Sequence, residues 1–261
     1  MPLFRVLCRF WLLTFFLLPV AVYAQSAADI MAKADRMNRP KYEISTMQME
    51  LVDSVGAVMK RELIWYFRNE EGKRTSLMKF TAPANMQGVG ILVIEEKQLP
   101  NAIWHYLPAS RNVRRISAAH RQNRFMGSEF VFEDFEGLKL DKYTFTLMGS
   151  KPCAESSECD VVEGKATDKE ESSSSSYRKK VFYVDKRNSA IIKTELFDRD
   201  GKLAKIFEAS GWRRVGDYWR PQLQTMSNVA EKRVTRLVEV ERKIDQPFDP
   251  YYTGQQYLRS E

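Results

Sequence analysis

The chain has 261 residues, of which 29% are charged, and carries a formal net charge of +7 at pH 7. This length suits one β-barrel or β-sandwich domain. The charge fits contact with an anionic surface or an acidic partner, and for an exported chain it excludes nucleic acid as that partner.

The first 24 residues predict a cleaved secretory signal peptide. Arg5 and Arg9 flank an apolar run, Phe10 to Val22, that is shorter than a bilayer span and ends beside small residues. We expect cleavage after Ala24, a periplasmic address, one domain over residues 25–261 and a net charge of +5 for that domain. An uncleaved membrane anchor is the alternative.

The next elements are a short helix and a series of strands. Ser26 and Asp29 form a capping box for a helix over Ser26–Arg36. From Tyr42 the hydrophobic period changes to two, so that Met47, Met49 and Leu51 share one strand face. In the following strand, over Lys60–Phe67, both faces are apolar, and this strand therefore needs cover on both sides.

Further strands follow at short intervals. They are expected around residues 90–94, 103–107, 181–184, 190–192, 203–212, 218–226 and 233–244. Short turns and the absence of a long helical period indicate an antiparallel meander. The serine-rich residues 165–176 are interpreted as a flexible hairpin excursion.

The stretch from Trp104 to Glu136 has the most unusual pattern of charge. A strand carrying Trp104 and Tyr106 on one face precedes five arginines without an intervening acid, and four carboxylates follow from Glu129 onward. These arginines could pair with the nearby carboxylates as a solvated loop. Large apolar residues interleave with the charges, however, so part of the stretch is expected to be buried.

The apolar strand faces allow two interpretations. One is a filled sandwich core. The other is a curved, incompletely closed barrel with an apolar cavity under a lid, which the flexible methionine side chains favour.

Cys153 and Cys159 remain after signal cleavage and are interpreted as a structural disulfide, because an exported protein enters an oxidising compartment. A redox or metal site is the alternative, but the spacing is not Cys-x-x-Cys and no histidine is near.

An enzyme is not expected. The chain has two histidines, His105 and His120, neither with an evident nucleophile, and it contains no GxSxG, HExxH or phosphate-binding glycine loop. We expect no cofactor and no metal.

Several motifs together carry a family resemblance. They are Met78-Lys79-Phe80, Pro83, Gly88, Leu92, the run from Trp104 to Pro108, Arg114-Arg115-Ile116, the run from Phe125 to Phe130, Glu133-Asp134, the run from Tyr218 to Pro221, Pro247-Phe248, Tyr252-Thr253 and Leu258. With them, residues 38–258 resemble the outer-membrane lipoprotein-sorting superfamily of LolA-like carriers, and in particular the branch that accompanies RND-type exporters.

The resemblance implies a half-open antiparallel β-barrel, a curved sheet of about eleven strands with short helices as a lid over an apolar cavity. It also implies a non-catalytic periplasmic carrier that moves the acyl chains of a lipoprotein or lipid towards the outer membrane, with an inner-membrane RND-type exporter as partner and transient membrane contact. The arginine tract and the cysteine pair depart from the best-known carriers. A non-carrying accessory module that docks on an exporter through its basic face is therefore the alternative.

Two groups of site residues follow as hypotheses. The cavity or lid is assigned to Met47, Met49, Trp65, Phe67, Leu92, Ile94, Trp104, Tyr106, Phe125, Met126 and Phe130. Docking of a partner or of lipid head groups is assigned to Arg111, Arg114, Arg115, Arg121 and Arg124. The segment from Phe125 to Phe130 would be the hinge or lid edge between them.

Overall fold

The computed structural model describes residues 26–37, 39–70, 72–96, 99–153, 157–167 and 169–260. The predicted signal peptide and its cleavage site lie outside these residues. None of the described helices is both long and apolar enough to span a bilayer.

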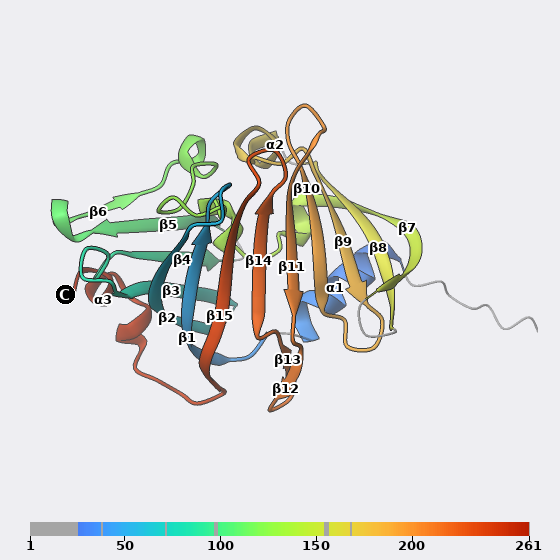
Figure 1. Cartoon of the computed structure of the whole chain (residues 1–261). Helices are drawn as coiled ribbons and strands as arrows, with labels where there is room; N and C mark the ends of the chain where they lie inside the picture. The colour runs from blue at the N-terminus through green and yellow to red at the C-terminus, as the bar shows by residue number, and fades with distance from the viewer. Residues whose placement is uncertain are drawn as a thin grey trace, which may run out of the picture.

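One large antiparallel sheet dominates the fold (Figure 1). Its thirteen strands have the order β6-β5-β4-β3-β2-β1-β15-β14-β11-β10-β9-β8-β7, so the described strands leave β6 and β7 as edges. The strands are β1 (Tyr42–Val52), β2 (Val58–Glu70), β3 (Lys73–Ala82), β4 (Gly90–Glu96), β5 (Leu99–Leu107), β6 (Asn112–Arg115), β7 (Tyr143–Cys153), β8 (Ser157–Ala166), β9 (Lys179–Asp185), β10 (Ile191–Phe197), β11 (Leu203–Ser210), β14 (Leu223–Asn228) and β15 (Arg233–Ile244).

The remaining elements are short. A two-stranded hairpin, β12 (Arg213–Val215) with β13 (Tyr218–Arg220), projects from the sheet. The helices are α1 (Ala27–Met37), η1 (Pro108–Ser110), η2 (Ala118–His120), η3 (Phe132–Phe135), η4 (Leu140–Lys142), α2 (Lys169–Ser174), η6 (Pro250–Thr253) and α3 (Gln255–Arg259).

The expected fold class is confirmed: the protein is mainly β, with a curved, unclosed antiparallel sheet and few helices. The main sheet has more strands than the eleven expected. Strand β6 of the main sheet has four residues, and β12 and β13 outside it have three each, too few for a period of two to be recognised in the sequence.

Helix α1 begins at the predicted cap. The backbone N–H of Asp29 donates to Ser26 Oγ over 3.1 Å, and Ser26 Oγ donates back to the Asp29 carboxylate over 2.6 Å. The apolar side of the helix, with Ile30 and Met31, packs against Phe182 and neighbouring residues of β8 and β9. Figure 1 shows α1 behind these strands, within the curve of the sheet.

The sheet buries side chains on both faces. The inner face, on the side of α1, carries a cluster that includes Met49, Leu63 and Leu237. On the outer face, Tyr66, Leu77 and Leu92 are covered by the C-terminal segment, residues 247–259. Phe248, Tyr252 and Tyr257 surround the Tyr66 ring, with ring centroids 5.0 to 5.6 Å away. The two apolar faces of β2 are thus both covered, as its sequence requires.

The serine-rich excursion is more ordered than expected. Within residues 165–176 lie the end of β8 and helix α2, and both Ser174 and Ser175 are buried. Ser175 Oγ and the Ser176 N–H donate to the Glu133 carboxylate over 3.3 and 2.9 Å. Serine hydroxyls and amides here satisfy a buried acid, a role that composition alone does not reveal.

The cysteine pair forms the expected disulfide. Cys153 ends β7 and Cys159 lies in β8, with 5.7 Å between their Cα atoms. The bond closes the hairpin at the β7 edge of the sheet.

Candidate functional site: the inner face and its plug

The inner face is built by alternate residues of successive strands. Met47 and Met49 on β1 and Leu63 and Trp65 on β2 belong to one apolar cluster, as their period of two predicts. Phe67 has the same parity on β2, but it lies beyond the cluster and is half-buried. Of the residues assigned to the cavity from the sequence, Met47, Met49 and Trp65 lie in this cluster. We call the part of the cluster on β1 and β2 the floor.

A hairpin that is not part of the sheet covers this floor. We call residues 121–136 the plug. The N–H of Phe125 donates to the carbonyl of Phe130 over 2.9 Å, and an isolated bridge joins Arg124 to Val131. Met126 and Gly127 form the turn with positive φ angles of 49° and 74°. Gly127 suits this conformation, because it has no Cβ to clash.

The rings of the plug fill the space above the floor. Phe125 is fully buried, and its ring centroid lies 5.8 Å from that of Phe80 on β3 and 5.0 Å from that of Phe135. Trp65 meets Phe135 edge to face at 6.1 Å. Phe130 and Phe132 are also buried in this cluster. In this state the inner face is therefore occupied by the protein's own aromatic side chains.

Three cationic side chains from the sheet hold the turn of the plug. Arg61 Nη1 donates to the Met126 carbonyl over 2.7 Å, Arg233 Nη2 to the Gly127 carbonyl over 3.0 Å, and Lys205 Nζ to the Glu129 carbonyl over 2.5 Å. Burial lowers the pKa of Lys205 and of Arg61. Each of these contacts runs from a side chain to the backbone, so none of them is part of a strand ladder.

The middle of the plug buries two carboxyl groups. Burial raises the pKa of both Glu133 and Asp134. Asp134 accepts a hydrogen bond from the Val131 N–H over 2.8 Å and another from the Tyr177 hydroxyl over 3.1 Å. Glu133 Oε1 accepts from Ser175 and Ser176, whereas Glu133 Oε2 has no hydrogen-bond partner among the described residues. Through these bonds the two acids help to anchor the plug.

Four of the predicted cavity residues lie on the opposite face. Leu92, Ile94, Trp104 and Tyr106 belong to the outer cluster beneath the C-terminal segment, whereas Phe125, Met126 and Phe130 pack on the inner face. The reason is strand parity, because Leu92 pairs with Trp104 across the ladder and both point outward.

Sequence reasoning missed the inner residues of these two strands. They are Ile91, Val93, Ile103 and His105, and the first three are almost fully buried. His105 meets the rings of Phe125 and Phe132 at 5.9 and 5.4 Å, and burial lowers its pKa to about 4. The alternation of apolar residues could have placed these four residues on one face of the sheet. It could not have shown which face the plug covers.

The structure divides the arginine tract in two. Arg121 pairs with Glu136 over 2.7 Å at the base of the plug, and Arg124 lies 3.4 Å from Glu129. By contrast, Arg111, Arg114 and Arg115 are exposed and form no ion pair with any described residue. We call these three residues, on and beside β6, the arginine hairpin.

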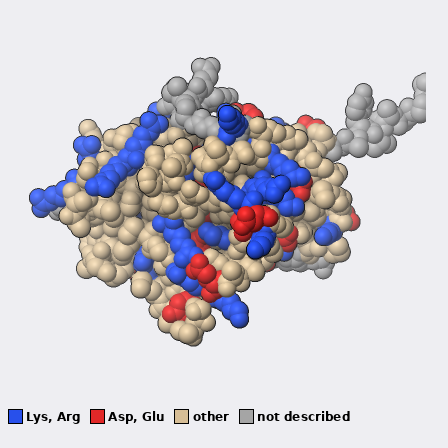
Figure 2. Space-filling view, turned by 90° about the horizontal axis from the view of Figure 1, so that it is seen from above, with Lys and Arg blue, Asp and Glu red and all other residues tan. Residues whose placement is uncertain are grey.

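The arginine hairpin lies at one end of the molecule. In Figure 2 basic side chains extend at the left end, where Figure 1 places β6, and no acidic residue adjoins them in that view. Its exposed cations are the part of the tract that remains available to an anionic surface.

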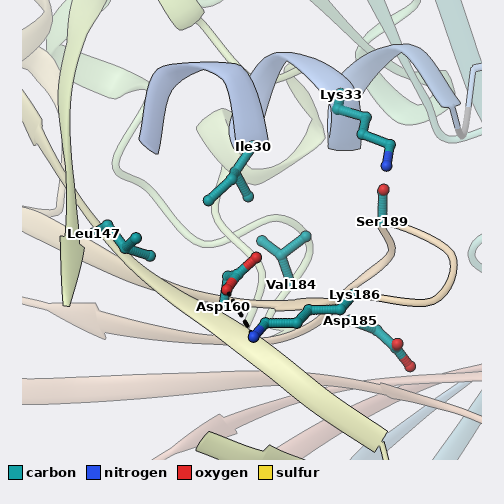
Figure 3. Close-up of a pocket in the computed structure, with 8 residues that line it drawn as sticks. All are labelled: Ile30, Lys33, Leu147, Asp160, Val184, Asp185, Lys186 and Ser189. Carbon is teal, nitrogen blue, oxygen red and sulfur yellow. Dashed lines mark ion pairs between the residues drawn. The ribbon is translucent and has the colours of Figure 1, made fainter. Parts of the chain in front are cut away.

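Two pockets open beside the covered inner face. One, of ≈ 370 Å³, lies under α1 and is drawn in Figure 3, where Ile30 and Lys33 point from the helix towards the strands. Its floor includes the ion pair between Asp160 and Lys186, at 3.5 Å. The other, of ≈ 410 Å³, lies beside the turn of the plug and is lined by Arg61 among others.

The amino-acid sequence matches the model of one protein family. A family model described as "Uncharacterized protein" matches residues 72–260. Among the curated proteins, none matches this chain.

The structure is similar to solved structures over nearly its whole length. A domain named for outer membrane lipoprotein sorting, from Vibrio parahaemolyticus, has 26% identity and a TM-score of 0.83, covering 90% of this chain and 98% of its own. A DUF1329 family protein from Desulfovibrio piger has 22% identity and a TM-score of 0.82, covering 89% and 97%. A LolA superfamily protein from Nitrosomonas europaea has 18% identity and a TM-score of 0.68, covering 89% and 99%.

Proposed function

Because this chain belongs to the family whose model matches residues 72–260, and to the LolA-like superfamily of outer membrane lipoprotein-sorting proteins, we propose that it is a periplasmic carrier of acyl chains. It binds the chains of a lipoprotein or lipid on the inner face and carries them towards the outer membrane. Export requires the predicted signal peptide, and no catalytic step is involved.

One observation carries the proposal: the inner face is apolar, and its cover is a hairpin tethered to the sheet through side chains. A carrier needs an apolar surface that is hidden from water when no cargo is bound and that becomes accessible when cargo binds. Displacing the rings of Phe125, Phe130, Phe132 and Phe135 would expose this surface while the thirteen-stranded sheet stays intact.

The energies of exchange support reversible loading. Burying an acyl chain contributes about 0.8 kcal/mol per methylene, or on the order of 10 kcal/mol for a long chain. Exposing a phenylalanine costs about 1.5–3 kcal/mol, so exposing four rings costs roughly as much free energy as the burial of one long acyl chain contributes. The two quantities nearly balance, and cargo could therefore both enter and leave. A much tighter fit would trap it.

The arginine hairpin is the proposed docking surface. Arg111, Arg114 and Arg115 offer exposed guanidinium groups without carboxylate partners among the described residues. Guanidinium binds carboxylate and phosphate bidentately, which suits an acidic face of an inner-membrane RND-type exporter or anionic lipid head groups. Arg121 and Arg124 were assigned to the same surface from the sequence. In the structure they form ion pairs with carboxylates of the plug.

A second function is favoured by the filled inner face. If the plug never leaves, the protein is a non-carrying accessory module that docks on an exporter through the arginine hairpin. The buried Phe125 and the polar anchors of the plug are compatible with that role.

Native mass spectrometry of the protein purified from periplasm, followed by organic extraction, separates the two functions. A carrier would bring a stoichiometric lipid or acylated peptide and would bind a fluorescent fatty acid after extraction. A protein that arrives empty and binds no fatty acid would contradict the carrier and leave the accessory role.

A further inference from the structure

The pocket of ≈ 410 Å³ lies where three segments meet. The β1–β2 hairpin, the turn of the plug and the start of β15 form its walls. Half of its lining residues are apolar: Leu51, Val52, Ala57, Val58, Met59 and Val234. Its volume falls in the range of roughly 300–1,000 Å³ found for small-molecule sites. Val58 and Met59 are 50% and 56% exposed, so an apolar surface leads from solvent to the pocket.

Arg61 is the unusual member of this lining. It is only 8% exposed, yet no described carboxylate lies within ion-pair distance of its guanidinium. Nη1 donates to the Met126 carbonyl, Nη2 contacts Met59 Sδ at 3.5 Å, and Nε has no hydrogen-bond partner among the described residues. The Phe80 ring lies 5.7 Å away.

A buried guanidinium in this state is costly. It has five N–H donors; each Nη group has one contact, and the buried Nε–H has no partner among the described residues. A buried charge without a counter-ion is strongly destabilising unless something else compensates it. The pocket is therefore prepared for an anionic group that would satisfy Arg61.

The acids in the lining are already engaged. Asp53 Oδ1 accepts hydrogen bonds from the backbone N–H groups of Val55 and Ala57 over 3.0 and 2.9 Å. Glu129 pairs with Arg233 over 3.0 Å and with Arg124 over 3.4 Å. Glu129 Oε1 has no hydrogen bond either, but it has a counter-ion in Arg233, so among the described residues Arg61 is the buried charged group of the lining without an ion pair. In the pocket under α1, the Asp185 carboxylate already accepts hydrogen bonds from the Ser157 hydroxyl and the Arg187 guanidinium.

We propose that this pocket binds the anionic head of a single-chain amphiphile, with the head on Arg61 and the start of the acyl chain along Val58 and Met59. The ligand chemistry is a carboxylate or phosphate joined to an alkyl chain. This inference rests on the proposed carrier function and names the feature of the cargo that the protein recognises.

The test compares hexadecanoate with hexadecanol, which share a chain and differ in charge. At pH 8 the protein should bind hexadecanoate about tenfold or more tightly, because hydrogen bonds to charged groups are the stronger ones. Arg61→Met should remove this preference; because it also loses a contact that holds the plug, the measured quantity is the ratio of the two affinities and not either affinity alone. Arg61→Lys, which keeps the charge, should retain part of the preference if Arg61→Met does not fold.

Arg68→Met is the matched control. Arg68 lies on the same strand and pairs with Glu70, so its loss changes the net charge equally and should leave the preference intact. Equal binding of the two ligands by the unmodified protein, or a preference that survives in Arg61→Met, would overturn the inference and leave the carrier function standing. Binding of neither ligand would overturn the carrier function itself.

Inorganic phosphate and 1-hexadecanoyl lysophosphatidic acid distinguish the source of the anion. Competition by the lysolipid with hexadecanoate, without competition by phosphate at millimolar concentration, is the expected result. Competition by phosphate alone would indicate a simple anion site and contradict the amphiphile.

Discussion

The ring of Phe125 is stacked on that of Phe80, with an interplanar angle of 15° and centroids 5.8 Å apart. One ring belongs to the plug and the other to β3. This contact joins the cover to the sheet at the centre of the inner cluster, so the stability of the plug and access to the inner face are linked through it.

Phe125→Ala should weaken the plug and expose the inner face. Loss of this fully buried ring should lower the free energy of unfolding by about 3–5 kcal/mol. The apparent affinity for a fluorescent fatty acid should rise, because a larger fraction of molecules would be open. Denaturant titration and fluorescence titration measure the two effects. Leu92→Ala, on the outer face, should lose stability without gaining affinity; a gain in both variants would contradict the model of a displaced plug.

A disulfide between the plug and the sheet should block loading. The Glu129 N–H lies 2.9 Å from Thr235 Oγ1, so cysteines at positions 129 and 235 are close enough to be tested for cross-linking. We expect the oxidised Glu129→Cys, Thr235→Cys variant to bind a fatty acid about tenfold more weakly than its reduced form.

The controls for this lock are the two single-cysteine variants and the unmodified protein, each measured with and without reductant. They are needed because the reductant also opens the Cys153–Cys159 disulfide. If the locked protein loads as well as the reduced one, cargo binds without displacing the plug.

Arg114→Glu with Arg115→Glu should weaken binding to vesicles that contain anionic lipid. Each arginine near such a surface contributes about 1 kcal/mol, so the pair should cost about 2 kcal/mol or more, roughly 30-fold. Vesicle sedimentation at several salt concentrations measures this, and fatty-acid binding should not change. Arg214→Glu with Lys232→Glu alters the net charge equally at other exposed positions. The same loss there would show that net charge, and not the arginine hairpin, is responsible.

His105→Phe should flatten part of the pH dependence of stability. Burial lowers the pKa of His105 from 6.5 to about 4, so between these values the unfolded chain binds the proton and the folded one does not. Stability from this group is therefore complete above pH 6.5 and is lost as the pH falls towards 4, by on the order of 3 kcal/mol.

Comparing the two proteins isolates this contribution. The raised pKa values of Glu133 and Asp134 act in the opposite direction, because those acids favour the folded state when protonated. Denaturant unfolding of both proteins at pH 4.5 and 7.5 is the measurement, and fatty-acid binding at pH 7.5 should be retained. Equal pH dependence of the two proteins would contradict the assignment.

Local chemistry in the sequence predicted the local structure well. The Ser26–Asp29 cap, the alternation along β1 and β2 and the Cys153–Cys159 disulfide all depend on residues close together in the chain. Covers on both faces of β2 followed from its two apolar faces. In each case the physical cause lies within a few residues.

The assignment of residues to one cavity required information from distant parts of the chain. Alternation places Leu92 and Trp104 on a common face, but that this face meets Phe248 and Leu258 depends on the path of the C-terminal segment. Charge order likewise does not separate Arg114 from Arg121, because their difference arises from the folding of the plug, which brings its two ends, Arg121 and Glu136, together. Packing between segments that are distant in the sequence decides what covers the face of Leu92 and Trp104 and which arginines form ion pairs.

The pairing of β1 with β15 has a consequence for how the molecule is made. Glu43 lies opposite Ile244, so strands from opposite ends of the described chain close the ladder between the two halves of the sheet. Strands β2 to β6 lie on one side of this seam, and β7 to β11 with β14 lie on the other. A chain that crosses a membrane with its N-terminus first cannot complete the seam until the last strand has emerged. For the exported chain proposed above, this topology would delay final folding until translocation is nearly finished, and the chain would stay threadable until then.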